Sequence, residues 1–259
     1  MKDLIEKEGV FKVTPQTTVC DYDRNQRLTL FAFLKYQQEA AEQHANAIGY
    51  SYGEMIAHNM VFLVNQSRNI IHRMPEYHEK IHIFTWASGT KGVRFYRCFE
   101  WYSESGEHLA SGMNVYIIVN VLTHKPLKST SLYGELKSYD YSCAARDYMP
   151  KIQIADTEFV GTKTVLFTDL DVNNHLNNAR YADVLQNFLP ESRQNDKITG
   201  FAVDFVKEAP LGMNINIEAV TTDCTVMQGI ADDKVRFRGY VEYENLNHTH
   251  RRYYRKCAV

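Results

Sequence analysis

The segment DLDVNNHL, residues 169–176, places a carboxylate, an amide and an imidazole at alternate positions, as Asp171, Asn173 and His175. Alternate side chains of an extended segment point to the same face. The next residues, 177–189, have a helix pattern that begins with asparagine. We therefore expect the three side chains beside the N-terminal N–H groups of a helix, where they supply an acid or base, a hydrogen-bonding group and an oxyanion site.

An earlier segment, DYDRNQRL at 21–28, repeats this phrase. The matching pairs are Asp21 with Asp169, Asp23 with Asp171, Asn25 with Asn173 and Leu28 with Leu176. Arg27 stands where the second copy has His175. Arginine cannot give up its proton in a protein, so the first copy cannot perform the same base chemistry.

Asp and Asn also shape turns and cap helices without any catalytic role. We interpret the first copy in that way. For the second copy the spacing alone leaves both interpretations open, with His175 either a catalytic group or only a neighbour of the turn.

The repeat extends to the elements that follow each copy. The first is followed by a helix pattern over 28–48 and by strand patterns, and the second by a helix pattern over 177–189 and again by strand patterns. The expected strands are 60–71, 80–88, 93–103 and 108–121 in the first half, and 198–206, 213–224, 234–244 and 248–259 in the second. Each half is thus predicted to be a long helix packed on the buried face of an antiparallel sheet, which makes the chain an α+β protein. In the strand expected over 234–244, apolar and polar residues alternate strictly, which predicts one buried face and one solvent-exposed face that carries the polar residues.

Composition limits the class of protein. The chain has 259 residues, 44% hydrophobic and 23% charged, with a net charge of −2. These values are typical of a globular protein and give no general attraction for nucleic acid. No secretion signal or membrane span is predicted, so a cytoplasmic location is expected by default. The five cysteines have irregular spacing, which fits neither a disulfide framework nor paired zinc ligands.

Two motifs suggest metal sites but lack the necessary context. The DxDxN phrase resembles a calcium loop, yet both copies lack the glycine and the final glutamate of that loop. HEKIH, residues 78–82, matches the zinc-protease pattern, which requires a helix. The residues around it predict a strand, on which the two imidazoles would lie roughly 13 Å apart. We keep a zinc protease only as a rival hypothesis and predict no metal or cofactor.

Most of the chain resembles the acyl-acyl-carrier-protein (acyl-ACP) thioesterase family. The resemblance is carried by residues 169–185 and 205–210, and it covers residues 21–45, 74–102 and 115–128 as well. It implies two tandem hotdog domains, which we place at 1–128 and 157–259 with a linker at 129–156. The first domain would hold the acyl chain and the second would be catalytic.

The resemblance also implies a site and an activity. The family's catalytic residues correspond to Asp171, Asn173, His175 and Glu208, and the implied reaction releases a fatty acid from acyl-ACP through an activated water. Many plant members have a cysteine directly after the glutamate, but this chain has Ala209, which argues against an obligatory cysteine nucleophile unless Cys224 replaces it. The rival activities are a hotdog acyl-CoA thioesterase and a noncatalytic acyl-ligand sensor. Association of two chains into a homodimer is a further expectation from the resemblance.

Overall fold

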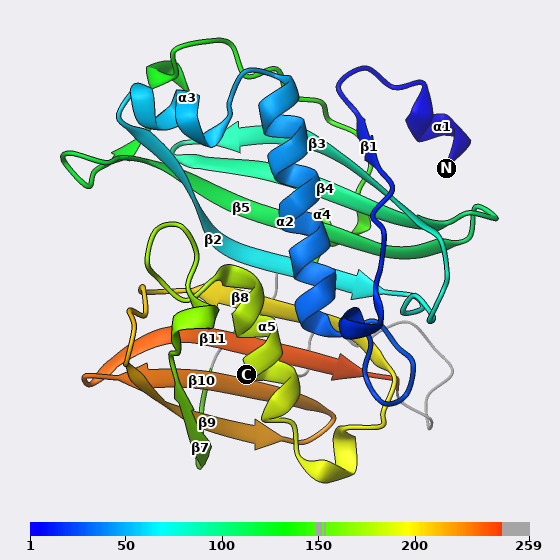
Figure 1. Ribbon diagram of the computed structural model, residues 1–259, viewed down its shortest axis with the longest axis vertical. Helices are drawn as coiled ribbons and strands as arrows, with labels where there is room; N and C mark the ends of the chain where they lie inside the picture. The colour runs from blue at the N-terminus through cyan, green and yellow to red at the C-terminus, as the bar shows by residue number, and fades with distance from the viewer. Residues whose placement is uncertain (149–151, 153, 245–259) are drawn as a thin grey trace.

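The computed structural model describes residues 1–148, 152 and 154–244, and it has two helix-on-sheet units, one above the other in Figure 1. The first unit contains β1 (Phe11–Val13), α2 (Leu30–Ala47), α3 (Tyr52–Ala57), β2 (Met60–Ile71), β3 (Ile81–Lys91), β4 (Arg94–Ser103) and β5 (His108–Asn120). The second contains β7 (Glu158–Thr164), α5 (Asn178–Asn187), β8 (Ile198–Phe205), β9 (Asn214–Thr221), β10 (Cys224–Ala231) and β11 (Lys234–Tyr243). The expected α+β fold of two hotdog-type units is confirmed.

The two units share one antiparallel sheet, in the order β1-β3-β4-β5-β2-β8-β11-β10-β9-β7. The joint is the pair β2 and β8, in which Ser67 faces Val203. This pairing covers an edge of each unit's sheet, and an exposed edge would otherwise be open to other strands. Both helices cross the same side of the sheet, as Figure 1 shows.

Each helix begins and packs by the same rules in the two units. Thr29 caps α2 by accepting a hydrogen bond from Ala32 N, and Asn177 caps α5 by accepting one from Ala179 N. Under α5 the strand β11 has Gly239, where an added Cβ would lie 2.1 Å from a methyl carbon of Leu185. A glycine is needed there because helix and strand approach too closely for a side chain.

The segment between the units covers the other side of the first sheet. Cys143 and Ala145, the latter in the short helix α4 (Ala144–Asp147), pack with Phe84, Trp86 and Cys98 in a buried cluster. The residues predicted as a plain linker therefore form a second apolar layer. Just before this segment, the two-residue strand β6 (Pro126–Leu127) pairs with β5.

A similar layer corrects the prediction for strand β11. Arg236 and Tyr240 were expected to be wet, but both are buried. Tyr240 packs with Tyr148, Ile152 and Cys224 on the back of the second sheet. Alternation along one strand does not reveal that a distant segment folds over its polar face.

Two strands were missed, and other expectations are not tested by the structure. Strands β7 and β10 were not predicted, because β7 is largely exposed and β10 mixes polar and apolar residues without strict alternation. The predicted final strand, 248–259, lies outside the described residues. In the described part of the chain, no helix is long and apolar enough to cross a membrane. The cytoplasmic location stays a prediction.

Candidate active site

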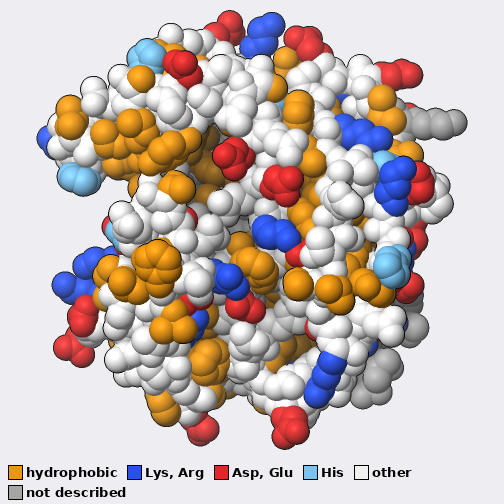
Figure 2. Space-filling model, viewed as in Figure 1, with side chains coloured by type: hydrophobic (Ala, Val, Ile, Leu, Met, Phe, Trp, Pro, Cys, Tyr) orange, Lys and Arg blue, Asp and Glu red, His pale blue; other side chains and the backbone are white. Residues whose placement is uncertain are grey.

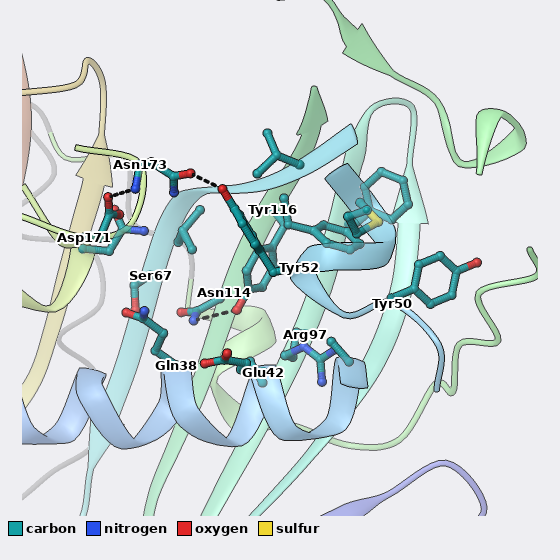
Figure 3. A pocket seen from close by; sticks show the side chains of 18 of the residues that line it. Gln38, Glu42, Tyr50, Tyr52, Ser67, Arg97, Asn114, Tyr116, Asp171 and Asn173 are labelled. Carbon is teal, nitrogen blue, oxygen red and sulfur yellow. Dashed lines mark hydrogen bonds between the residues drawn. The ribbon is translucent and has the colours of Figure 1, made fainter. Parts of the chain in front are cut away.

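A cavity of about 710 Å³ lies between α2 and the first sheet and extends to the second unit. Its walls in the first unit are mainly apolar, and they include Leu34, Ala41, Met55, Val61, Phe62, Val64 and Phe95. Its other end is formed by Asp171 and Asn173 and by the first residues of α5, Asn178 and Ala179. Figure 3 shows this end of the cavity opposite Tyr50, and Figure 2 shows a recess with hydrophobic side chains on the same side of the molecule. The cavity thus joins an apolar chamber to a polar helix N-terminus.

The segment 171–175 is a tight turn, which corrects the expectation of an extended segment. Asp171 N donates to His175 O (2.9 Å), and Asn174 adopts a left-handed φ of 61°. The Asp171 carboxylate accepts hydrogen bonds from the backbone N–H groups of Asn173 (2.8 Å) and His175 (3.4 Å). Since Asp171 is used to close the turn, its role in this structure is to hold the other two residues.

The structure brings His175 and Glu208 together. His175 Nε2 lies 3.3 Å from Glu208 Oε2. The contact depends on a second pairing, in which Leu176 N donates to Ala209 O at 2.9 Å and aligns the two loops. Buried Arg236 fixes the glutamate's backbone by donating to its carbonyl oxygen (3.0 Å). The His175 and Glu208 side chains are 34% and 61% exposed, so the pair is open to solvent.

Asn173 points away from this pair and toward the first unit. Its Oδ1 accepts a hydrogen bond from the hydroxyl of Tyr52 (3.1 Å), which belongs to α3 (Figure 3). Asp171 and Asn173 line the cavity, whereas His175 and Glu208 are not part of its lining. The four predicted residues therefore form two adjoining groups on one turn and its partner loop.

Sequence reasoning missed Tyr52 and Arg236, which support these groups, and it also missed Tyr181. Burial raises the pKa of Tyr181. The charge of Arg236 acts in the opposite direction, and the charges of Glu208 and Asp171 raise this pKa further. Tyr181 follows the turn closely in the sequence, so a side chain packed beneath the site could have been anticipated there.

The first copy of the turn has the same backbone but different chemistry. Asp23 Oδ1 accepts from Asn25 N (2.7 Å) and Arg27 N (3.1 Å), as Asp171 does in the second copy. Leu28 N donates to Pro75 O (3.1 Å), just as Leu176 N donates to Ala209 O. Pro75 thus corresponds to Ala209, and Met74 corresponds to Glu208.

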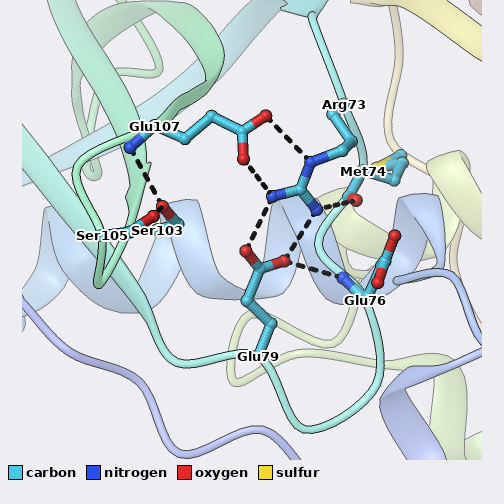
Figure 4. A network of polar contacts seen from close by, with 7 residues as sticks. All are labelled: Arg73, Met74, Glu76, Glu79, Ser103, Ser105 and Glu107. Carbon is cyan, nitrogen blue, oxygen red and sulfur yellow. Dashed lines mark hydrogen bonds and ion pairs between the residues drawn. The ribbon is translucent and has the colours of Figure 1, made fainter.

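The first unit therefore lacks both members of the His–Glu pair. Arg27 instead donates to the carbonyl oxygens of Asn195 (3.1 Å) and Asp196 (3.0 Å) in the second unit. Figure 4 shows what surrounds Met74: Arg73 forms ion pairs with Glu79 (2.8 Å) and Glu107 (2.6 Å). These contacts fix loops, and they leave the first copy with a structural role.

The same network explains the HEKIH segment. His78 lies in a turn with a left-handed φ of 68°, Glu79 is paired with Arg73, and His82 follows on β3 with its Nδ1 2.8 Å from Thr14 Oγ1. The predicted strand is confirmed only for His82, at the start of β3, since His78 and Glu79 lie in the turn before that strand; the segment does not form the helix that the zinc-protease pattern requires. Within the described ranges, no group of three or more His, Cys, Asp or Glu side chains could hold a metal ion.

Asp21 and Asp169, the buried first residues of the two copies, stabilise them through ion pairs and hydrogen bonds. Burial would raise the pKa of the Asp21 carboxyl, but hydrogen bonds from Lys35, Tyr36 and Thr18 outweigh burial and hold this pKa below its usual range. Likewise, burial of Asp169 is outweighed by bonds from the Lys163 ammonium (2.6 Å) and the Leu166 N–H (2.9 Å). Both aspartates are therefore ionised in the folded protein.

The position beside Glu208 offers no thiol. Ala209 is fully buried, and Cys224 lies in the cluster on the back of the second sheet. The helices α2 and α5 lie on the opposite side of that sheet (Figure 1). Cys224 is thus separated from the turn by the sheet itself.

Comparison with known proteins agrees with the resemblance in the sequence. The N-terminal domain model of acyl-ACP thioesterases matches residues 8–131, and the C-terminal domain model matches residues 154–248. The palmitoyl-acyl carrier protein thioesterase of Gossypium hirsutum is 24% identical over 217 residues, covering 76% of this chain and 51% of that protein. The chain spans about half the length of the curated relatives it matches.

Solved structures share the whole fold. A crystal structure of an acyl-ACP thioesterase from Bacteroides thetaiotaomicron has a TM-score of 0.84 at 21% identity, covering 91% of this chain and 98% of the other. The 12:0-ACP thioesterase from Umbellularia californica has a TM-score of 0.78 at 17% identity, covering 92% and 98%. The two domain models together match most of the chain, and on that ground it belongs to the acyl-ACP thioesterase family.

Proposed function

We propose that this protein hydrolyses the thioester of fatty acyl-ACP to a free fatty acid and carrier protein. The observation that carries the proposal is the cavity, whose apolar chamber in the first unit ends at Asp171, Asn173 and the N-terminus of α5. An acyl chain in the chamber would bring its thioester to that turn. The relatives named above are thioesterases for palmitoyl and 12:0 chains, which supports a fatty acyl substrate.

The proposed reaction uses an activated water. Glu208 or His175, whose Oε2 and Nε2 atoms lie 3.3 Å apart, takes a proton from the water that attacks the carbonyl carbon. Asn173 holds the carbonyl or the water, and Asp171 holds the turn. The N–H groups at the start of α5 stabilise the oxyanion, because a helix N-terminus carries partial positive charge. Collapse of the tetrahedral intermediate releases the thiolate of the carrier, which takes up the proton.

The division of labour between the units follows from the differences between the two copies. With Arg27 and Met74 in place of histidine and glutamate, the first unit has no pair of side chains that could act as a general base. Most residues that line the chamber belong to this first unit. We propose residues 1–128 as the acyl-binding domain, 129–156 as the connection and 157–259 as the catalytic domain.

Thiol release from carrier-bound and CoA-bound chains of eight to eighteen carbons tests the activity. We expect faster turnover on the carrier-bound form of each length that the cavity accepts. Faster turnover on the CoA form would identify an acyl-CoA thioesterase instead. Binding of acyl chains without hydrolysis of either form would identify a ligand sensor. The homodimer stays a prediction, which the molecular mass in solution tests.

A further inference from the structure

One wall of the acyl cavity carries a charged group. Arg97 on β4 lines the chamber together with Asn114 and Tyr116 on β5. Arg97 faces Asn114 across the ladder, and Phe95 faces Tyr116, so these four side chains lie on the helix-covered side of the sheet. Figure 3 shows Asn114 in the middle of the view and Arg97 farther from Asp171, above the end of α2.

The charge of Arg97 is not neutralised by the protein. Its Nη1 donates to His44 Nδ1 (2.7 Å) and lies 3.3 Å from Thr85 Oγ1. Burial and the Arg97 charge lower the pKa of His44 to about 4, so this histidine is a neutral acceptor near pH 7. Among residues 1–148 and 154–244, no carboxylate oxygen lies within 4.0 Å of the Arg97 guanidinium.

Two other polar side chains of the same wall, Asn114 and Tyr116, have hydrogen-bonding groups that the described residues leave unpaired. Asn114 is 6% exposed, and its Oδ1 has no hydrogen-bond partner in the described part of the chain. The Tyr116 hydroxyl accepts a bond from Asn114 Nδ2 (3.4 Å), and its own proton remains to be donated. The half-buried charge of Arg97 without a counter-ion and the buried Asn114 acceptor without a donor are both costly, so these groups are suited to a polar ligand.

A plain alkyl chain gives nothing to these groups, because methylene and methyl groups neither accept nor donate hydrogen bonds. We infer that the cavity takes acyl chains that carry an oxygen function at the end remote from the thioester, and that a terminal carboxylate fits Arg97 best. A hydroxyl could accept from Arg97 and donate to Asn114, but only a carboxylate also neutralises the guanidinium. This inference rests on the proposed function, since it assigns the far end of the same substrate.

Among the residues that the structure describes, the cavity lining contains two carboxylates, Asp171, which closes the turn, and Glu42, which must be considered as a competitor. It lies on α2, is exposed, and forms no ion pair with Arg97. Its charge should oppose the entry of a carboxylate-bearing chain. Removing that charge by Glu42→Gln is therefore expected to strengthen carboxylate binding.

The test compares methyl-ended, hydroxyl-ended and carboxyl-ended acyl-ACP of equal length, from eight to sixteen carbons. At the best length we expect kcat/KM for the carboxyl-ended chain to exceed that for the methyl-ended chain by roughly 10- to 100-fold, as one charged hydrogen-bonded contact provides. Arg97→Met should remove this ratio, while Arg94→Met, which changes an exposed arginine of the same strand, should preserve it. A higher ratio for the hydroxyl-ended chain would still support an oxygenated terminus and would assign its recognition to Asn114. Preference for the methyl-ended chain at every length, or an unchanged ratio in Arg97→Met, would overturn the inference.

A binding measurement separates this inference from the proposed reaction. Calorimetric titration with the N-methylamide of nonanoic acid and the mono-N-methylamide of nonanedioic acid involves no thioester and no hydrolysis. We expect tighter binding of the carboxylate-bearing amide to the wild-type protein, and tighter still to Glu42→Gln. Equal binding of both amides would contradict the inference even if acyl-ACP is hydrolysed. Selective binding without any hydrolysis would contradict only the proposed reaction.

Discussion

Arg27 and His175 occupy equivalent places in the two turns, and we predict opposite consequences when each is replaced. Arg27 is half-buried and donates to two backbone carbonyls of the second unit, at 3.1 and 3.0 Å. His175 pairs with an exposed glutamate, an interaction that contributes roughly 0–1 kcal/mol to stability. Replacing Arg27 should therefore cost stability, whereas replacing His175 should cost activity.

The magnitude for Arg27→Met follows from the two bonds. Hydrogen bonds from a charged donor contribute about 1.5–3 kcal/mol each when buried. Access of water to this half-buried side chain reduces that value, and we expect a total loss of about 1–2 kcal/mol. For a chain of this size that loss lowers Tm by about 2–8 °C. Turnover on acyl-ACP should stay within a factor of about two, a change of only about 0.4 kcal/mol.

Thermal unfolding and thiol release, measured on the same preparations, check both statements. Arg24→Met is the matched control, because Arg24 is exposed and makes one long contact with Asn195 Oδ1 (3.4 Å). It should leave Tm within about 1 °C of wild type. If Arg27→Met abolished turnover without lowering Tm, the assignment of a structural role to the first copy would be wrong.

Three further predictions concern other contacts. Tyr52→Phe should lower kcat about 2- to 10-fold at unchanged Tm, because it removes the hydroxyl that holds Asn173. The control is Tyr133→Phe, since Tyr133 lies outside the cavity lining. Equal rates in both variants would refute the role of Tyr52 in positioning Asn173. Gly239→Val should lower the free energy of unfolding by about 1–3 kcal/mol, because the new side chain forces Leu185 away. Gly53→Ala has open space at its Cβ and should raise the free energy of unfolding by at most about 1 kcal/mol. Denaturant titration measures both values. The lowered pKa values of Asp21 and Asp169 contribute stability at pH values above the ordinary aspartate pKa, and this contribution is lost as pH falls through the folded-state pKa values. Between about pH 5 and pH 2, the free energy of unfolding should therefore depend less on pH in the Asp21→Asn, Asp169→Asn double variant than in the wild type.

Local patterns were sufficient to predict most of the fold. The helix over 28–48 and the strand over 60–71 agree closely with α2 (Leu30–Ala47) and β2 (Met60–Ile71), because caps and hydrophobic periods depend on neighbouring residues. The repeated turn was visible because each aspartate bonds backbone groups within four residues. The layers on the back of the sheets were not visible, since they depend on contacts between distant segments.

The site shows the same limit. The residues of the turn could be chosen from their spacing, but Glu208 was found only through the resemblance, because its contact with His175 depends on the pairing of two separate loops. Tyr52 reaches Asn173 from the other unit, and its sequence context gives no sign of that contact. Arg97 lies in an ordinary strand pattern, and only the cavity shows that its charge lines the apolar chamber.

The most direct test of the central claim is thiol release from one acyl-ACP by His175→Ala and by Glu208→Gln, with circular dichroism to show that both variants are folded. Cys224→Ala serves as the control for a thiol nucleophile. We expect kcat to fall by about 10²- to 10⁴-fold in the first two variants, as the loss of a general base predicts, and to stay near the wild-type value in the third. Near wild-type rates in both His175→Ala and Glu208→Gln, or loss of activity in Cys224→Ala alone, would contradict the assignment of catalysis to the second copy of the turn.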